Sequence, residues 1–331
     1  MKIAIVILNW NGKKLLEQFL PSVVKYSQEA KIYVADNAST DESKSFLTDN
    51  FKEVVIIQNK TNGGFAKGYN DALKNLKEDL LVLLNNDVEV TQNWLQPIIN
   101  EFNQDTSLVA AQPKILDFKN KNYFEYAGAG GGFIDQFGYP FCRGRIFNSI
   151  ERDKGQYNDI KKIFWATGAC LIIKNNEFKE LNGFDEIFFA HQEEIDLCWR
   201  IQKTGGTIKY IGNTTVFHVG AATLSNYDPT KTFYNFRNSL LMLVKNVNSS
   251  KVWVILFVRL LLDGIAGLSF LIQGKWKHTL AIVKAHLSFY CLLPSYVNNP
   301  SKNRKKIRYY LIKSIVWNYF IRKNRIFKNL N

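Results

Sequence analysis

This 331-residue chain has few cysteines, and its N-terminus does not have the pattern of an export signal. The four cysteines (Cys142, Cys170, Cys198 and Cys291) lie far apart and form no CxxC pair. We therefore expect no disulfide framework, a reducing compartment, and thiols that serve as small core residues. The N-terminal MKIAIVILNW is too short and too weakly flanked for a signal peptide and predicts a first strand instead. There is no internal repeat or low-complexity segment, and an apolar content of 46% supports a packed core.

Acidic residues are almost absent from the last third of the chain. Residues 231–331 contain 18 Lys and Arg but one acid, Asp263, a net charge of +17. The first 230 residues contain 25 Lys and Arg against 28 Asp and Glu, a net charge of −3. This asymmetry predicts a polyanionic partner for the C-terminal third, either a membrane surface or a nucleic acid.

Apolar runs in the same third favour a membrane. Val252–Gln273 is long enough to cross a bilayer, but Arg259 and Asp263 would each cost roughly 2.5–3.5 kcal/mol inside lipid. Leu280–Leu293 is too short to span, and Lys302–Lys328 has the pattern of a basic interfacial helix. We predict a peripheral helical region with at most one embedded helix. Packing on the rest of the protein, or a dimer interface, is the alternative for Val252–Gln273.

Strand-like and helix-like segments alternate in the first half of the chain. This order predicts an α/β fold with a doubly wound, mostly parallel sheet over residues 1–225, followed by the basic helical region 226–331. Ligands of such sheets bind at the carboxyl ends of the strands. The predicted strands are Ile3–Leu8, Ile32–Asp36, Val54–Gln58 and Leu80–Leu84, and the predicted helices are Lys13–Tyr26, Ser43–Asn50, Phe65–Leu76 and Asn93–Asn103.

The pattern is less regular after residue 115. Residues 115–162, rich in Gly, Asn and aromatic residues, predict an insertion with irregular or hairpin structure. Regular elements then resume, and Gly205-Gly206 ends the predicted helix. These elements are the strand Ala166–Ile173, the helix Glu193–Lys203, and the short strands Thr207–Ile211 and Thr215–His218.

Four groups of polar residues are candidate site residues, and each has a structural alternative. Asp36 could accept hydrogen bonds from a nucleotide, or start an Asx turn. Asp87, after the strand LLVLL, could hold Mg²⁺ or Mn²⁺ against a pyrophosphate, or lie in a polar turn. Glu193 and Glu194 could supply a general base, or interact with the helix dipole, with nearby Asp196 pairing to Arg200. His218 could be a metal ligand or a structural histidine.

The order of these groups resembles that of glycosyltransferase family 2, which has the GT-A fold, and most closely its rhamnosyltransferase-like branch of bacterial surface-polysaccharide enzymes. The resemblance covers residues 3 to 220. It rests on IVILNWNG, VADNASTDES, NKTNGGFAKGYNDAL, LLNNDVEV, TGACLIIKNNEFKELNGFDEIFFAHQEEIDLCWR and TTVFHVG.

The resemblance implies a role for each candidate residue. Asp87 and His218 would bind Mg²⁺ or Mn²⁺, and Glu194 would be the catalytic base. Trp165, Asp185 and His191 would face the sugars or the acceptor. The nucleotide-sugar donor would contact Asn9, Asn11, Asp36, Asn62, Gly63, Asn70 and Asn86.

Three departures from the family pattern are informative. Asn85 stands where many relatives have Asp, which removes a metal carboxylate. The acidic pair is Glu193-Glu194 rather than Glu-Asp, so either residue could be the base. His191 stands where an aromatic residue is common, which marks a different acceptor. The QxxRW motif of processive synthases is absent, which predicts transfer of one sugar per event.

The resemblance therefore implies a single inverting transfer from a nucleotide-sugar, with dTDP-rhamnose as a candidate donor. The acceptor would be a lipid-linked molecule or a polysaccharide at the cytoplasmic face of the cell membrane. Two alternatives remain. A nucleotidylyltransferase would carry a Gly-rich phosphate loop where this chain has NWNGKK. A nucleic-acid-binding protein would use the +17 tail, although its apolar runs fit lipid better. We also expect a fragment ending near Thr230 to be soluble.

Overall fold

The computed structural model describes residues 1–220, 228–247, 250–297 and 305–330. In the first part of the chain, strands alternate with helices as the sequence predicts, and α1 and α2 have the predicted bounds. These elements are β1 (Ile3–Asn9), α1 (Lys13–Tyr26), β2 (Lys31–Asp36), α2 (Ser43–Asn50), β3 (Val55–Gln58), α3 (Gly64–Leu73), β4 (Leu80–Asn85), β5 (Val88–Val90) and α4 (Gln96–Gln104).

The middle of the chain completes the sheet and adds a smaller one. The larger sheet gains β6 (Leu108–Asp117), β11 (Ile160–Lys162), β12 (Cys170–Lys174) and β13 (Thr207–His218), while α5 (Asn175–Glu180), η1 (Glu186–Phe188) and α6 (Glu193–Thr204) lie between the last two strands. The predicted insertion contains hairpins, which form a four-stranded antiparallel sheet of β7 (Gly132–Ile134), β8 (Pro140–Cys142), β9 (Arg145–Ile146) and β10 (Ser149–Ile150).

The main sheet has nine strands in the order β11-β13-β6-β12-β4-β1-β2-β3, with β5 also paired to β13. β1, β2, β3, β4, β6 and β13 run in one direction, whereas β12 is antiparallel to both of its neighbours. This confirms the predicted α/β class with a mostly parallel sheet. The strand order reverses at β1, where Asn9 pairs with Asp36 and Leu8 with Asn85. The predicted binding residues therefore lie at the switch point, where open α/β sheets bind ligands.

Alternating side chains of the central strands enter two cores. Ile5 and Ile7 of β1 point to the face covered by α1, α2 and α4, whereas Ala4 and Val6 point to the face covered by α3, α5 and α6. The second core continues into the C-terminal helices through the buried Leu240–Leu243. Of the cysteines, three are buried as predicted, but Cys291 is exposed.

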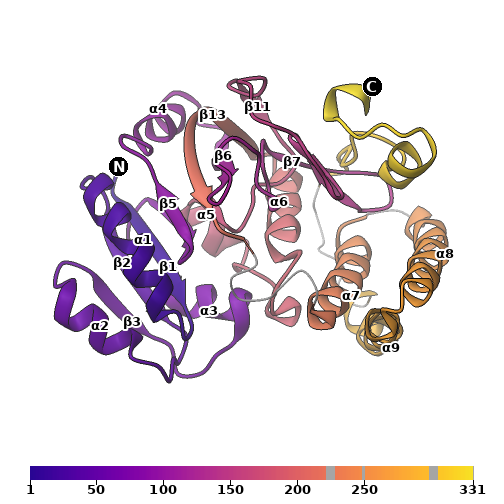
Figure 1. Cartoon of the computed structure of the whole chain (residues 1–331), viewed down its shortest axis with the longest axis horizontal. Coiled ribbons are helices and arrows are strands. Elements are labelled where there is room, and N and C mark those ends of the chain that lie inside the picture. The colour runs from indigo at the N-terminus through magenta and orange to yellow at the C-terminus, as the bar shows by residue number, and fades with distance from the viewer. Residues whose placement is uncertain (221–227, 248–249, 298–304, 331) are drawn as a thin grey trace.

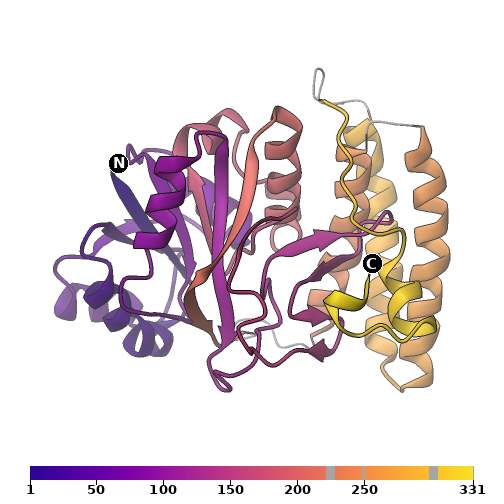
Figure 2. The ribbon, with the colours of Figure 1, turned by 90° about the horizontal axis from the view of Figure 1, so that it is seen from above.

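The C-terminal region forms a layer of helices beside the sheet (Figures 1 and 2). It contains α7 (Pro229–Asn246), α8 (Lys251–Ile272), α9 (Trp276–Val297), η2 (Trp317–Ile321) and η3 (Phe327–Leu330). α7 packs against both α6 and α9. A fragment ending near Thr230 would expose the apolar side chains that α7 buries, so the structure argues against the expectation that such a fragment is soluble.

Three predictions of local structure are wrong. Leu280–Leu293 lies within the 22-residue α9, so both α8 and α9 are long and apolar enough to cross a membrane. Thr207–Ile211 and Thr215–His218 belong to one strand with an irregularity between Ile211 and Thr215. The described part of Lys302–Lys328 is mostly irregular. There, Tyr309 packs on Trp199 and the Ile315 backbone binds Asp135, and these contacts compete with a continuous helix.

Candidate functional site

The carboxyl end of β1 carries a tightly packed pair of amides. Asn9 is fully buried, and its Oδ1 accepts a hydrogen bond from Asn86 Nδ2 at 2.9 Å. A Cβ on Gly12 would lie 2.3 Å from Asn9 Oδ1 and 2.4 Å from Asn86 Nδ2. Any larger residue would displace these two amides, because real Cβ atoms do not approach other atoms so closely. The NWNG turn is therefore built around these two amides.

Asp36 ends β2 with an unused acceptor. Its side chain is 2% exposed, and Oδ2 accepts hydrogen bonds from the Ser39 backbone N–H at 3.0 Å and from Gln58 Nε2 at 2.8 Å. Oδ1 is buried and has no hydrogen-bond partner. A buried carboxylate oxygen without a donor is costly, so this atom is suited to a ligand N–H or O–H.

Asn11, Asn62 and Gly63 shape the loops beside Asp36. Asn11 has a φ of +49°, and its Oδ1 accepts a 2.7 Å hydrogen bond from the Thr40 backbone. Asn62 Oδ1 accepts from Asn37 Nδ2 at 2.9 Å, and Gly63 precedes the first residue of α3. These contacts join three strand-end loops, so the residues define the shape of the predicted nucleotide site. Direct contact with the donor remains a prediction.

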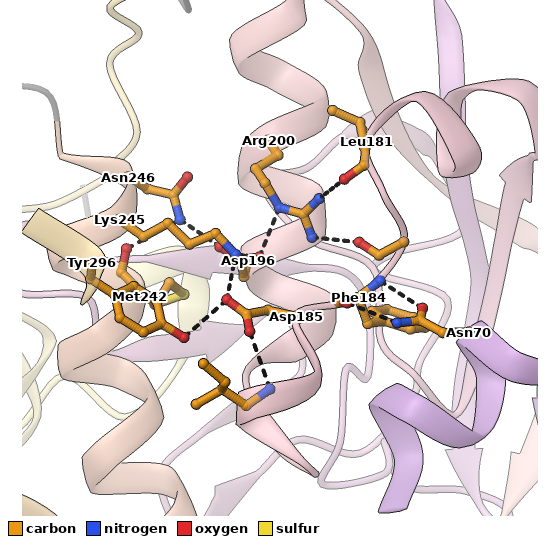
Figure 3. A network of polar contacts seen from close by, with 12 residues as sticks. Asn70, Leu181, Phe184, Asp185, Asp196, Arg200, Met242, Lys245, Asn246 and Tyr296 are labelled. Carbon is orange, nitrogen blue, oxygen red and sulfur yellow. Dashed lines mark hydrogen bonds and ion pairs between the residues drawn. The ribbon is translucent and has the colours of Figure 1, made fainter. Parts of the chain in front are cut away.

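Asn70 lies on α3 and has partners of its own. It donates to the Phe184 carbonyl at 2.9 Å and to Glu186, and accepts from the Phe184 backbone N–H at 2.9 Å. Figure 3 shows this amide turned toward the Phe184 backbone. Asn70 therefore fixes the loop before α6, and little of its hydrogen-bonding capacity remains for a ribose or a phosphate.

The candidate metal ligands Asp87 and His218 meet at the end of β4. Asp87 Oδ1 lies 3.0 Å from His218 Nε2, and both residues are buried. On the other side of the imidazole, Nδ1 lies 3.4 Å from Glu125 Oε2. Burial opposes protonation of His218, but the carboxylates of Glu125 and Asp87 outweigh it and raise its pKa to about 10. Glu125 therefore orients the imidazole, as carboxylates commonly do for histidine metal ligands.

These donors fit a divalent metal ion that displaces the proton on His218 Nε2, because a histidine binds a metal as the neutral imidazole. A carboxylate oxygen and an imidazole nitrogen that converge on one point suit Mn²⁺ or a related ion. Among the described residues, no group of three or more His, Cys, Asp or Glu side chains is placed to hold a metal. Asn85 directs its Nδ2 to His218 Nε2 at 3.3 Å and adds no carboxylate. An ion here would depend on donor phosphates to complete its coordination.

The first turn of α6 carries acids of two kinds. Glu193 and Glu194 each have a buried Oε2 without a hydrogen-bond partner. Burial raises the pKa of Glu194 to about 7, and burial together with the Glu194 charge raises the pKa of Glu193 well above its usual range. Burial also opposes ionisation of Asp196, but Arg200 and Lys245 hold its pKa far below the usual range.

Both carboxylate oxygens of Asp196 have partners in a network of polar contacts (Figure 3). Its carboxylate contacts Arg200 Nε at 2.8 Å, Lys245 Nζ at 2.9 Å and Asn246 Nδ2 at 2.7 Å. The predicted Asp196–Arg200 pair is confirmed, and the network ties α6 to α7. Glu193 and Glu194, with raised pKa values and free oxygens, are the acids suited to exchange a proton.

Contacts through one short segment link α6, which carries Glu194, to the end of β4. Cys198, one helical turn after Glu194, contacts the Ala166 backbone N–H through its sulfur at 3.4 Å. The same segment continues to Ala169, whose carbonyl accepts from the Asn85 backbone N–H at 3.0 Å. The helix that carries the candidate base and the strand that leads to the candidate metal site therefore both contact one short stretch, residues 166–169.

The three residues predicted to contact sugars have different surroundings. Trp165 is 3% exposed and donates to the Phe133 carbonyl at 3.0 Å. Asp185 contacts Lys245 Nζ at 2.7 Å and the Tyr296 hydroxyl at 3.0 Å (Figure 3). The structure thus gives Trp165 and Asp185 packing and pairing roles. His191 has a buried Nε2 without a partner, and burial and nearby Lys231 lower its pKa to about 4.

The sequence analysis missed three residues that the structure brings to the site. Glu125 lies in the aromatic-rich insertion, where no local pattern distinguishes it from a surface acid. Arg237 and Asn238 lie on α7 and hold the backbone carbonyls of residues 187–191. Both residues lie after residue 226, so the sequence analysis assigned them to the helical region. Their contact with residues 187–191 could not be predicted, because about 50 positions separate the two segments.

Comparisons with known proteins bear on the family and the fold of the chain. A family model described as "Glycosyl transferase family 2" matches residues 4–174, just over half of the chain. N-acetylglucosaminyl-diphospho-decaprenol L-rhamnosyltransferase of Mycobacterium tuberculosis is 23% identical, over 65% of this chain and 75% of that protein.

Two solved structures show the fold. S. aureus TarS 1-349 with UDP-GlcNAc has a TM-score of 0.58 at 14% identity, covering 90% of this chain and 83% of that chain. The mannosyltransferase PcManGT of Pyrobaculum calidifontis, with GDP-Man and Mn²⁺, has a TM-score of 0.54 at 11% identity, covering 87% of each chain. The arrangement of the sheet is therefore of the GT-A type.

Proposed function

Because the chain belongs to glycosyl transferase family 2, we propose that it transfers one sugar at a time from a nucleotide-sugar to a hydroxyl of a lipid-linked or polysaccharide acceptor. Members of this family transfer sugars from nucleotide-sugars with inversion. The finer assignments concern the donor, the acceptor and the residues. The observation that carries them is the set of buried carboxylate oxygens without a hydrogen-bond partner, on Asp36 at the end of β2 and on Glu193 and Glu194 at the start of α6.

We assign the roles as follows. Asp36 Oδ1 accepts a hydrogen bond from the base or the ribose, and the Asn9–Asn86 pair forms the floor of the nucleotide site. Mg²⁺ or Mn²⁺ bound to Asp87 and His218 would neutralise charge on the departing nucleoside diphosphate. Glu194 accepts the proton of the acceptor hydroxyl as its oxygen attacks the anomeric carbon. The bond to the diphosphate breaks, and the product sugar has the inverted configuration.

The raised pKa of Glu194 suits this role, because a base with a pKa of about 7 is about half ionised at neutral pH and is basic enough to accept a proton. Glu193 is the alternative base, since it shares the burial and the unpaired oxygen. The similarity to a decaprenol-linked rhamnosyltransferase supports dTDP-rhamnose as the first donor to test and a lipid-linked acceptor.

We further propose that α8 and α9 lie flat on an anionic membrane. Arg259 and Asp263 are buried toward the protein, where they pair at 3.3 Å, so their charges do not have to enter lipid. Large apolar side chains project outward instead, each at least 60% exposed. These are Val254, Phe257, Ile265, Leu268, Ile272 and Leu287. An apolar outer face on a region of net charge +17 favours lipid over nucleic acid.

The proposed reaction is tested with a panel of nucleotide-sugars, including dTDP-rhamnose, UDP-GlcNAc and GDP-mannose, and a short polyprenyl diphosphate-sugar acceptor. We expect release of nucleoside diphosphate from one donor, a product of inverted anomeric configuration by NMR, and loss of the signal with EDTA. Pyrophosphate release from a nucleoside triphosphate and a sugar 1-phosphate would indicate a nucleotidylyltransferase instead.

The membrane proposal is tested by sedimentation of the full chain with phosphatidylglycerol or phosphatidylcholine vesicles. We expect binding to the anionic vesicles, and loss of binding in the Val254→Glu/Phe257→Glu variant, which places charge on the outer face of α8. Retention of the full chain in the supernatant at low salt would contradict the proposal, and a dimer in solution would support an interface between copies instead.

A further inference from the structure

The backbone that leads into α6 is strained. Phe189, His191 and Gln192 have φ values of +62°, +70° and +75°, in the left-handed region that residues with a Cβ rarely adopt. Gln192 caps α6, and its carbonyl accepts from the Asp196 backbone N–H at 2.9 Å. Glu193 and Glu194 follow directly, so the path of residues 187–192 determines where the acids point.

The C-terminal helix α7 supplies the contacts that hold this segment. Asn238 Nδ2 lies 2.9 Å from the Phe188 carbonyl, 3.0 Å from the Ala190 carbonyl and 2.7 Å from the His191 carbonyl. Asn238 is fully buried. An amide carries two N–H groups, so three carbonyls converge on one donor nitrogen and share its hydrogens.

Arg237 fixes the orientation of that amide. Its Nε donates to Asn238 Oδ1 at 2.9 Å, which directs Nδ2 toward the loop. A terminal nitrogen of Arg237 also donates to the Ile187 carbonyl at 2.6 Å. On the opposite side of the loop, the backbone N–H groups of Phe65 and Ala66 donate to the Phe189 carbonyl at 2.7 and 3.1 Å. The loop is thus held between α3 and α7.

We propose that Arg237 and Asn238 are positioning residues for the acidic pair, so that the C-terminal region forms part of the active site as well as an anchor. This inference rests on the proposed function, because it takes Glu194 or Glu193 as the base. Neither residue contacts substrate. They stabilise a strained loop conformation that the loop residues alone would rarely adopt.

The chain offers an isosteric test and a matched control. Asn238→Asp preserves the shape and the acceptor for Arg237 but removes the donors that face the carbonyls, while Asn238→Ala removes both. Ser239→Ala is the control, because the neighbouring Ser239 is equally buried and its Oγ accepts from Arg259 at 2.8 Å, away from the loop. It removes a buried hydrogen bond from the same helix without touching residues 187–192.

The experiment measures transfer kinetics and hydrogen exchange in the full chain. We expect both Asn238 variants to lower kcat by about 10²-fold, because misplacement of a catalytic group by 1 Å has that effect, with the donor KM within about threefold. Amide exchange over residues 187–193 should accelerate in these variants and stay unchanged in Ser239→Ala, which should keep wild-type kcat.

Equal losses of kcat in Ser239→Ala and Asn238→Ala, in proportion to their Tm, would overturn the proposal. Unchanged exchange over residues 187–193 in the Asn238 variants, or wild-type kcat in Asn238→Asp, would also overturn it. The exchange measurement uses no substrate. It therefore still judges the positioning role if Glu194→Gln and Glu193→Gln prove active and the proposed base is wrong.

Discussion

The strand-end site and the C-terminal helices both bury charged side chains, but they satisfy them differently. In the helices, buried Asp263 contacts Arg259, His286 and the Tyr139 hydroxyl, at 2.9 to 3.3 Å. At the strand ends and the start of α6, one oxygen each of Asp36, Glu193 and Glu194 is buried without any partner. Other buried polar atoms also lack a partner, but among the described residues these three are the carboxylate oxygens that do, and an unpaired buried carboxylate oxygen is suited to a ligand.

The same contrast occurs within one helix. Asp196 and Glu194 are two residues apart on α6, yet Asp196 is ionised and paired on every side while the pKa of Glu194 is raised to about 7. The presence of Asp or Glu in the sequence therefore does not identify the catalytic base. The surroundings of each carboxylate decide whether it holds the fold together or exchanges protons.

Replacing Glu194 by Gln should produce the largest loss. We expect kcat to fall by about 10²–10⁴-fold, the range for loss of a positioned general base, while donor affinity stays unchanged because the shape is preserved. Steady-state kinetics and calorimetric titration with the donor provide the measurements. A fully active Glu194→Gln beside an inactive Glu193→Gln would reverse the assignment within the pair.

Replacing Asp87 by Ala should remove metal binding while leaving the fold intact. Metal stabilisation of the leaving group contributes several kcal/mol, so transfer should fall by about 10³-fold. Glu89→Ala is the control, since Glu89 lies two residues away on β5 and pairs with Lys121 at the surface. Near wild-type activity of Asp87→Ala in saturating Mn²⁺ would refute the metal assignment.

Replacing Arg259 by Leu tests the paired charges of the C-terminal helices. It leaves Asp263 buried without its main cation, so the free energy of unfolding should drop by about 3–5 kcal/mol. Activity per folded molecule should not change. Denaturant titration gives the stability, and the double variant Arg259→Leu/Asp263→Leu should recover part of the loss. A large fall in kcat for the folded single variant would show that this pair serves the reaction.

The pH dependence of kcat/KM should distinguish the role of Glu194 from that of Asp196. A base must be unprotonated to act, so kcat/KM should fall about tenfold per pH unit below the Glu194 pKa of about 7 and level off above it. Asp196 stays ionised throughout this range and adds no step. An activity that is constant from pH 5 to 8 would exclude a base with a raised pKa.

Local sequence predicted those features that depend on local interactions. The bounds of α1 and α2, and the positions of Asn9, Asp36 and Asp87 at strand ends, follow from hydrophobic periodicity and from the polar residues that end each run. The meeting of Asp87 with His218 came from the family resemblance, because 131 positions separate them and only β13 beside β5 brings them together.

Features that depend on tertiary contacts could not be predicted from the sequence. Glu125 and Asn238 resemble ordinary surface residues until the fold buries them against His218 and the loop before α6. In the described residues 305–328, the helix predicted over Lys302–Lys328 is wrong, because Tyr309 and Ile315 form contacts with the catalytic part of the chain that a continuous helix would not allow. Asp185 matched a family motif, yet its partners are Lys245 and Tyr296.

Calorimetric binding of the active donor, with and without Mn²⁺, tests the central claim most directly, because it compares Asp36, Asp87 and Glu194 with one another before any chemistry occurs. The wild type and Glu194→Gln should bind the donor equally in Mn²⁺ and weakly in EDTA. Asp36→Ala should lose affinity in both, and Asp87→Ala should bind equally weakly with and without the metal. Metal-independent binding that survives both the Asp36 and the Asp87 substitutions would contradict the account.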